Sequence, residues 1–518
     1  MAKKIPLSEM LWRSRRGFLA VLLVVPLTPI IIFATDRARD VIVDLSEVNS
    51  FIQKNRKDST EQEKGGGCNV SSLLDSVSED ITKFSEDLPI VTCEGTDWVN
   101  CFKCECNITI AIQKTIKEIV CIYKDIIFVN DRYVYFGNPT TVVGNEMYTL
   151  NKSDHVKIDC TGKDMTSSDE RSHWSGYGTG FRPVPTKAEV SDQRDSYNVV
   201  ILCFDSATRH GFIRNMRQSY EYMTKQLNAV VLNSYNIVGN GTTDILFPIL
   251  TGKSEEELTN QRKRTTKKKY IDSKKFIFHL LKGNGYRTAY FEDILRAGTA
   301  ESKFNRFRRQ PADHYLRLPL LADTDKRQNW NHSENWSQGY PASHCFGAKP
   351  QYQLMINLTD QFLQLDGKKF CFTHVADVAY ENFILLPTAD ETLLSFLQTL
   401  SARRALEDTL VVIIGNHGSR SSPIQEPTQG KQEDRLPLMA ILLPEQLKIK
   451  RPKTLTTLKN NEDVLTTPFD IHATILDVLN LKNKNNRNMR GMSLLEPIPK
   501  SRSCGEAGVM PHRCACAH

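Results

Sequence analysis

Three short stretches of the sequence carry residues that could perform metal-assisted ester chemistry. Asp205 follows the apolar run VVILCF, and Asn416-His417 follows the apolar run VVIIG. Thr242 and Thr243 lie in a Gly-flanked turn ahead of another apolar run. An aspartate at a strand end can bind a metal ion. A threonine hydroxyl at a helix N-terminus can be deprotonated by that metal and act as a nucleophile, while backbone N–H groups hold the transferred anion.

Each stretch also has a purely structural interpretation. A strand-end aspartate such as Asp205 often caps the next helix. Thr242 could be a helix N-cap, or simply the third residue of the sequon Asn240-Gly241-Thr242. Asn416-His417 could be no more than a polar strand end. Only the three stretches taken together point to chemistry.

The elements that must position these residues follow a strand–helix alternation from about residue 195 onward. Aliphatic strands are expected at 287–293, 368–377, 408–416 and 436–444, and helices at 388–406 and 466–481. The second helix has Thr467 as its expected N-cap and Pro468 just inside. This alternation predicts an α/β domain over residues 195–500, with a mostly parallel sheet sandwiched by helices, and a Cys-containing tail at 501–518.

The N-terminus predicts membrane attachment. Residues 17–34 are an uncharged apolar run, long enough to cross a bilayer as a helix, and five Lys and Arg residues precede it within residues 1–16. The positive-inside rule then places residues 1–16 in the cytoplasm and the main domain in a lumen or outside the cell, as in a single-pass type II protein. The alternative is a cleaved signal peptide, because Ile32-Phe33-Ala34 weakly resembles a cleavage site.

Cysteines and sequons agree with a secreted or lumenal location. Residues 35–67 read as a stalk, and residues 68–190 as a Cys-rich, strand-biased module. The CFKCEC stretch in that module could bind a metal, but disulfides are the expected use in an oxidising compartment. Six further sequons predict glycosylation at Asn69, Asn107, Asn151, Asn331, Asn335 and Asn357.

The overall charge points away from nucleic acid. The chain has 518 residues and a formal net charge of +7, which is small for that length, so we expect no nucleic-acid partner. The basic run at 262–269, RKRTTKKK, reads as a solvated loop, with contact to an anionic partner as the alternative.

Taken in order, the stretches resemble a known family. The chain is similar to the metazoan family called domain of unknown function 229, within the alkaline-phosphatase and sulfatase superfamily. The resemblance spans about residues 195 to 516 and is carried by FDSATRHGFIRNM, VGNGTTDILFPILTGK, GYRTAYFED, FRRQPADHYLR, GNHGSR, TQGKQEDRLPLMAILLP, FDIHATILDVL and RGMSLLEPIPKSRSCGEAGVMPHRCAC. It implies an alkaline-phosphatase-like fold with a two-metal site at the carboxyl ends of the strands.

The resemblance also implies roles for individual residues. One metal is typically held there by a first Asp, the nucleophile and an Asp-His pair, which corresponds to Asp205, Thr242, Asn416 and His417, with Thr242 as the nucleophile. The second metal normally takes an Asp and two histidines, but the expected His position aligns with Val378. The residues that could substitute, none of them in the expected place, are His374, Asp377, Glu381 and Asp390. The Pro usual two residues after the nucleophile is replaced by Asp244.

These departures have physical consequences. Two close dications need several anionic ligands. Asn416 keeps an oxygen but removes a negative charge, and Val378 removes a ligand altogether. We therefore expect a divalent cation, which could be zinc, calcium or manganese, at one site rather than two, or at none. If the second metal is absent, part of the stabilisation of a phosphoryl-type transition state is absent too.

Two functions of different classes follow. The first is a hydrolase or transferase of phosphate or sulfate esters in the secretory pathway or outside the cell, whose substrate is an anionic ester or glycan. The second is a pseudoenzyme that keeps the fold as a binding or structural glycoprotein, because a fold alone does not decide activity. The two differ in the number of metal ions bound and in whether Thr242 is needed.

Overall fold

The computed structural model describes residues 90–165, 171–185, 197–259, 270–271, 273–293, 307–322, 344–379, 383–418, 433–481 and 490–516, all of which belong to the compact unit Gly67–His518. The expected tail, anchor and stalk at 1–16, 17–34 and 35–67 lie outside these ranges, as do the basic run 262–269, Asn69, Asn331, Asn335 and Glu381. Within the described ranges, no helix combines the length and the hydropathy that a bilayer crossing requires.

A seven-stranded sheet forms the centre of the α/β part. Its order is β10-β17-β16-β9-β15-β11-β12. The bounds are β9 Asn198–Phe204, β10 Val230–Val231, β11 Arg287–Glu292, β12 His314–Tyr315, β15 Lys369–Val375, β16 Thr409–Gly415 and β17 Met439–Leu442. The pairings among β16, β9, β15, β11 and β12 are parallel, while β17 runs antiparallel to β16. The expected mostly parallel sheet is confirmed, and β9 lies in its middle.

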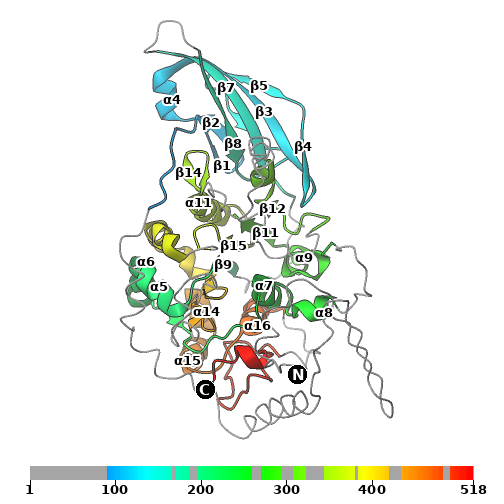
Figure 1. Ribbon diagram of the computed structural model, residues 1–518, viewed down its shortest axis with the longest axis vertical. Coiled ribbons are helices and arrows are strands. Elements are labelled where there is room, and N and C mark those ends of the chain that lie inside the picture. Colours follow the sequence, from blue (N-terminus) through cyan, green and yellow to red (C-terminus); the bar gives the residue numbers. More distant parts are fainter. Residues whose placement is uncertain are drawn as a thin grey trace, which may run out of the picture. The chain divides into compact units, whose positions relative to one another are not determined.

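Both faces of the sheet are covered, because alternate residues of each aliphatic strand point to opposite sides. Val199, Ile201 and Cys203 pack in one core, against α7 Thr242–Thr251, α9 Ile277–Gly283, α14 Glu445–Lys450, α15 Lys453–Asn460 and α16 Pro468–Val478. Val200 and Leu202 pack in the other core, against α5 Arg209–Asn215, α6 Arg217–Glu221, α11 Gln351–Leu363 and α12 Asp390–Ala402. Figure 1 shows α5 and α6 on one side of the strands and α7 on the other.

The α16 helix begins where the sequence predicts. Thr467 is its N-cap and Pro468 its first residue, and the Asp470 carboxylate accepts a hydrogen bond of 2.7 Å from the Thr467 backbone N–H. The same carboxylate pairs with the buried Arg502 of the C-terminal tail at 2.8 Å. Short elements of this part include α8 Glu255–Thr259, the π-helix η2 Tyr222–Gln226 and the antiparallel pair β13 Cys345–Phe346 and β14 Lys349–Pro350.

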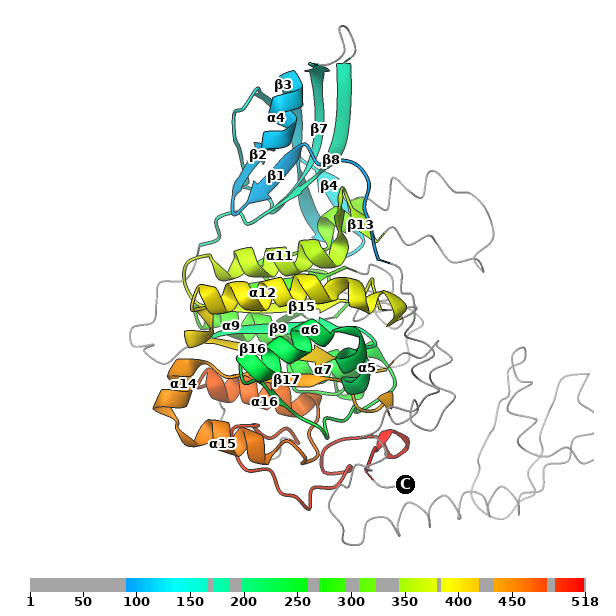
Figure 2. The same cartoon turned by 90° about the vertical axis from the view of Figure 1, so that its left-hand side faces the viewer.

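The Cys-rich stretch consists of antiparallel sheets, as its strand bias indicates (Figure 2). One sheet contains β1 Val99–Phe102, β2 Glu105–Ile108 and β6 Tyr148–Thr149. The other contains β3 Ile116–Asn130, β4 Tyr133–Phe136, β5 Thr140–Val143, β7 His155–Asp164 and β8 Arg171–Thr179, with the helix α4 Ile110–Thr115 leading into β3.

Disulfides are confirmed as the use of most described cysteines. The CFKCEC stretch forms the bond Cys101–Cys106, so the metal-knuckle alternative is wrong for this stretch. Further bonds join Cys121 to Cys160, Cys93 to Cys345 and Cys504 to Cys514. Among the described residues, Cys104, Cys203 and Cys371 are free thiols.

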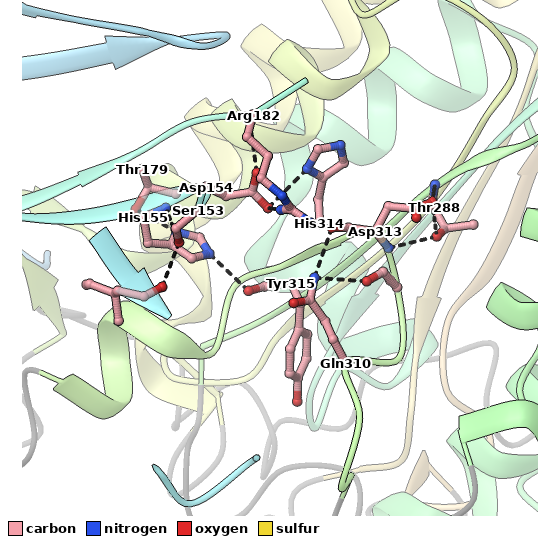
Figure 3. A network of polar contacts seen from close by, with 12 residues as sticks. Ser153, Asp154, His155, Thr179, Arg182, Thr288, Gln310, Asp313, His314 and Tyr315 are labelled. Carbon is pink, nitrogen blue, oxygen red and sulfur yellow. Dashed lines mark hydrogen bonds and ion pairs between the residues drawn. The ribbon is translucent and has the colours of Figure 1, made fainter. Parts of the chain in front are cut away.

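A buried polar network ties the Cys-rich sheets to the edge strand β12 of the central sheet (Figure 3). Asp154 Oδ2 lies 2.6 Å from Nη1 of Arg182 and 3.1 Å from Nδ1 of His314. Nε2 of His155 lies 3.0 Å from the carbonyl oxygen of Tyr315. Burial raises the pKa of Asp154, but His314 and Arg182 outweigh it and hold that pKa at about 2. Burial lowers the pKa of His155 to about 4.

Candidate functional site

Polar residues gather where four neighbouring parallel strands end. Asp205 follows β9, Asn416-His417 follows β16, His374 lies near the end of β15, and Glu292 ends β11. The register places His374 opposite Glu292 on one side and opposite Cys203 of β9 on the other. Because parallel strands end at the same edge of a sheet, these side chains meet there.

Asp205 is the centre of this group. It is 1% exposed, and Ser206 follows it with a positive φ of 52°, which turns the chain sharply at the strand end. Burial alone would raise the pKa of Asp205, but the side chains of His374, His417 and Asn416 lower it well below its usual range. The carboxylate is therefore ionised at neutral pH.

Thr242 is the first residue of α7 and not its N-cap. Gly241 occupies the N-cap position, and the Asp244 carboxylate accepts the backbone N–H groups of Asn240 and Gly241 at 2.8 and 2.9 Å. Asp244 thus performs the capping role at this helix start. The Thr242 hydroxyl is not needed for capping, and Oγ1 lies 3.5 Å from Nε2 of His417. The N-cap interpretation of Thr242 is therefore wrong.

His417 turns its Nε2 toward both partners. Its Nδ1 lies 2.8 Å from the carbonyl oxygen of Gly418, which can only accept, so Nδ1 carries a proton and Nε2 is the nitrogen left to bind a metal ion. That Nε2 lies 3.6 Å from Oδ1 of Asp205 and 3.5 Å from Oγ1 of Thr242. Without a metal, a second proton on Nε2 would offset the charge of Asp205, and a cation could take the place of that proton.

The spacing of these three atoms fits a divalent cation. At 3.6 Å a contact is too long for a good hydrogen bond. Metal–ligand bonds of 2.0–2.1 Å in a tetrahedral arrangement place neighbouring ligand atoms about 3.4 Å apart. The separations of Thr242 Oγ1 and of Asp205 Oδ1 from His417 Nε2, 3.5 and 3.6 Å, are close to that value. Asp205, Thr242 and His417, called here the Asp–Thr–His site, can therefore hold one cation.

Asn416 is present at the site but its oxygen is occupied. Oδ1 accepts the backbone N–H groups of Ser206 at 2.9 Å and His417 at 2.7 Å. The side chain is fully buried, and its Nδ2 has no hydrogen-bond partner. Asn416 therefore stabilises the two strand-end turns in this structure. Its oxygen is engaged by two backbone N–H groups, so the structure does not support the expectation that Asn416 is a metal ligand.

His374 lies on the far side of Asp205. Its Nε2 is 3.6 Å from Oδ2 of Asp205 and its Nδ1 is 3.7 Å from Oε1 of Glu292. Burial lowers the pKa of His374, but the two carboxylates outweigh it and raise that pKa to about 10. Without a metal, His374 is therefore an imidazolium ion between two carboxylates. Of the three substitute ligands that the structure describes, it is the one with a contact to Asp205.

The two other described substitutes, Asp377 and Asp390, have partners elsewhere. Asp377 Oδ2 lies 2.9 Å from Nδ1 of His344, and the Asp390 carboxylate accepts the backbone N–H groups that open α6, those of Gln218 and Ser219, at 2.9 and 2.8 Å. Asp390 is therefore a helix-capping residue, and its assignment as a metal ligand is wrong. Glu381 lies outside the described residues. Val378 packs in the apolar core between the sheet and α12.

Two carboxylates at this edge were missed from the sequence. Glu292 and Asp293 end the predicted strand 287–293, and the signal that identified Asp205, a carboxylate directly after a buried strand, applies to them equally. Asp293 Oδ1 accepts the backbone N–H groups of Ala376 at 2.8 Å and Asp377 at 3.2 Å. Burial and the Asp377 charge raise the pKa of Asp293 to about 8.

Another set of possible ligands lies in the C-terminal tail. Cys504, Cys514 and Cys516 are the only three described His, Cys, Asp or Glu residues whose ligand atoms all lie within 4.8 Å of one another. Cys504 and Cys514 are joined by a disulfide, so their sulfurs are not thiolates. The Asp–Thr–His site is not such a set, because its third donor is the hydroxyl of a threonine and not a His, Cys, Asp or Glu side chain.

Comparisons with known proteins give a family and a group of distant structures. The family described as "Protein of unknown function (DUF229)" matches residues 84–518, and no curated protein matches the chain. The lipoteichoic acid synthase LtaP from Listeria monocytogenes is 12% identical at a TM-score of 0.38, over 60% of this chain and 79% of that chain.

Two further structures are similarly distant. A protein in the alkaline phosphatase superfamily from Vibrio parahaemolyticus is 13% identical at a TM-score of 0.37, over 60% of this chain and 73% of that chain. The C-terminal periplasmic domain of EcEptC from Escherichia coli, in complex with Zn, is 13% identical at a TM-score of 0.36, over 61% of this chain and 91% of that chain. Because these TM-scores are low, the function is argued from the geometry of the site and not from these structures.

Proposed function

We propose that this chain, which belongs to the DUF229 family of proteins of unknown function, is a one-metal hydrolase or transferase of phosphate or sulfate esters with Thr242 as its nucleophile. The observation that carries the proposal is the position of His417 Nε2 at the end of the central strand. It lies 3.5 Å from Thr242 Oγ1 and 3.6 Å from Asp205 Oδ1. Alkaline-phosphatase-like ancestry, inferred from the order of the sequence motifs, is part of the proposal.

Each residue of the site has a distinct task. Asp205 supplies the negative charge that retains the cation, and His417 supplies a neutral nitrogen whose orientation is fixed by the Gly418 carbonyl. The bound cation would lower the pKa of the Thr242 hydroxyl and offset charge on the transferred group. The N-terminus of α7 adds the positive end of a helix dipole beside Thr242. The mixed N and O donors favour zinc or manganese over calcium, which prefers six to eight oxygens.

The positive charge of His374 takes the place of a second metal ion in this proposal. Its imidazolium ring lies against the second oxygen of Asp205, at 3.6 Å. A fixed positive charge there offsets carboxylate charge without a second dication. Glu292 on the other ring nitrogen holds the ring in place.

The pseudoenzyme remains a second candidate because of a specific observation. The Asn416 oxygen is engaged by two backbone N–H groups, and Val378 is buried in the apolar core, so two expected ligands of the superfamily are lost. If three donors do not retain a cation, the chain acts as a binding or structural glycoprotein.

The cellular setting is also a proposal. We infer a type II membrane protein anchored through residues 17–34, with its main domain lumenal or extracellular and without a nucleic-acid partner. The four disulfides between described cysteines and the exposed positions of Asn107, Asn151 and Asn357 support an oxidising, glycosylating compartment.

The test is turnover by the detergent-solubilised full chain with Zn²⁺ or Mn²⁺. Substrates are p-nitrophenyl phosphate, bis-p-nitrophenyl phosphate and p-nitrophenyl sulfate, with lipid and glycan acceptors to capture transfer. The proposal expects turnover that falls at least about 100-fold in Thr242→Ala and is partly kept in Thr242→Ser, because Ser retains the hydroxyl. Metal-dependent turnover that survives Thr242→Ala would exclude Thr242 as the nucleophile, and no turnover of any ester would favour the pseudoenzyme.

A further inference from the structure

The C-terminal tail is bound to the loop that precedes Thr242. The Met510 backbone N–H donates to the carbonyl of Val238 at 3.2 Å. The buried Asn236 side chain donates to the carbonyl of Arg513 at 2.8 Å and accepts from the backbone N–H of Ala515 at 2.8 Å. The Cys504–Cys514 disulfide closes the tail on itself. The tail therefore lies against the loop that leads into Thr242.

Arg513 connects the two loops that supply the site residues. Its Nε donates to Oδ1 of Asn240, two residues before Thr242, and its Nη1 lies 2.5 Å from Oδ2 of Asp434. The carbonyl oxygen of Asp434 accepts from the backbone N–H of Gly418, next to His417, at 3.2 Å. The guanidinium is thus held between the loop of the nucleophile and the loop of the metal-binding histidine.

A second guanidinium lies close to the first. Arg435 donates from Nη1 to the carbonyl of Cys514 at 2.9 Å. That contact places Arg435 against the residue next to Arg513, and the charge of Arg513 adds to burial in lowering the pKa of Arg435. Both arginines are only partly buried, so solutes can reach them. They are called here the cationic pair.

Among the described residues, the nearby carboxylates offset only part of the charge of the pair. Asp434 is the one carboxylate of the described ranges whose contacts and charge involve both arginines. The neighbouring Glu433 is already paired with Arg214, at 2.9 and 3.1 Å, and accepts from the Thr208 hydroxyl. The exposed ring of His512 adds a further nitrogen 3.0 Å from Asn240 Oδ1. Counted over the described residues, a positive charge in excess is therefore fixed beside the start of α7.

We propose that the cationic pair, Arg435 and Arg513, is a binding subsite for a second anionic group of the substrate, next to the group that reacts at Thr242. The substrate class is then an ester that carries two or more phosphate or sulfate groups. Arg recognises such groups through its planar array of donors, and the fixed charge raises affinity without affecting the chemical step. The inference rests on the proposed function, because it places the reacting group at Thr242.

Binding tests the subsite separately from turnover. Thr242→Ala protein is titrated calorimetrically with propyl phosphate and with propane-1,3-diyl bisphosphate, so that a failure of the proposed chemistry does not affect the result. The expected result is tighter binding of the bisphosphate, with a loss of about 10-fold on adding Arg513→Gln, since a charge-assisted hydrogen bond contributes more than 1 kcal/mol. Propyl phosphate affinity should change by less than about 2-fold in the same variant.

Controls separate charge from fold. Arg513→Lys keeps the charge and should keep most of the bisphosphate preference, and Arg404→Gln removes an exposed arginine on another part of the chain and should change nothing. Should Arg513→Gln fail to fold, Arg435→Gln is the replacement, with the same expected loss. The inference is overturned if the bisphosphate binds no tighter than propyl phosphate, or if both ligands weaken equally. Intact bisphosphate selectivity in a protein without Thr242-dependent turnover would refute the proposed chemistry and keep the subsite.

Discussion

Thr242 Oγ1 lies 3.5 Å from Nε2 of His417, although 175 residues separate them in the sequence. The contact exists because α7 begins at Thr242 beside the end of β16, where the Gly418 carbonyl accepts from Nδ1 and so orients the imidazole with Nε2 toward Thr242. Oδ1 of Asp205 lies 3.6 Å from the same nitrogen. A hydroxyl and a carboxylate thus both lie against one imidazole nitrogen.

Asn416→Asp should change stability in opposite directions with and without metal. The new carboxylate can still accept the N–H groups of Ser206 and His417, and its second oxygen places a charge near Asp205. Without metal the repulsion lowers the melting temperature, and with metal the extra charge raises Zn²⁺ affinity at least about 10-fold. Thermal melts with EDTA and with Zn²⁺ test this, with Asn416→Ala as the control. Equal shifts in both conditions would contradict the placement of Asn416 beside the cation.

Val378→His should damage the fold without restoring a second metal. Val378 is 1% exposed in the core formed with α12, so an imidazole there has no water and no room. The expected loss is about 2–4 kcal/mol of unfolding free energy. Urea denaturation and metal content measure the two effects, and Val378→Ala reports the loss of packing alone. A variant of normal stability that gains a metal equivalent would show that the second site needs only this residue.

The sequence identified the parts of the site that have local signals. Asp205 and His417 follow aliphatic strands, and Thr242 stands in a glycine turn before a helix, so each was found without knowing the fold. Asn416 could not be judged, because the occupation of its oxygen depends on Ser206, 210 residues away. Asp390 was misassigned for the same reason, since it caps a helix 171 residues earlier in the chain.

Long-range packing also hid residues that adjoin the site. Glu292 and Asp293 are carboxylates at the end of a buried strand, like Asp205. The strand was predicted from its aliphatic pattern, but the carboxylates at its end were not considered as site residues. Arg513 and its contact with Asn240 span 273 residues, and nothing near Arg513 in the sequence indicates that the tail returns to the nucleophile loop. The strands β9, β11, β15, β16 and β17 and the helices α12 and α16 were predictable because aliphatic runs, helical periodicity and Thr467-Pro468 are local features.

The buried His155 predicts loss of stability in mild acid. Its pKa is about 4 when folded, below the usual 6.5, so unfolding takes up a proton between these values and stability falls as the pH drops from 6.5 towards 4. At pH 4.5 the loss is about 2 to 3 kcal/mol relative to neutral pH. His155→Gln can still donate to the Tyr315 carbonyl but does not titrate. Urea denaturation should show a flatter pH profile for that variant, and identical profiles would exclude His155 as the cause.

Topology is tested by glycosylation. Asn107, Asn151 and Asn357 are exposed, so each can be reached by the glycosylation machinery if the main domain is lumenal. Glycosidase treatment of the cell-made full chain should lower its apparent mass, and replacing these three residues by Gln should reduce that shift. A chain whose mass does not change, or whose main domain is digested from the cytosolic side, would refute the type II orientation.

The most direct test of the account is the metal stoichiometry of the Asp–Thr–His site. Full-length protein, freed of metal by chelation, is titrated with Zn²⁺ alongside the variants Asp205→Asn and Arg404→Gln. We predict one tight equivalent per chain, lost in Asp205→Asn because the retaining charge is gone, and unchanged in Arg404→Gln. Two tight equivalents, none, or one that persists in Asp205→Asn would contradict the assignment of Asp205, Thr242 and His417 as a single cation site.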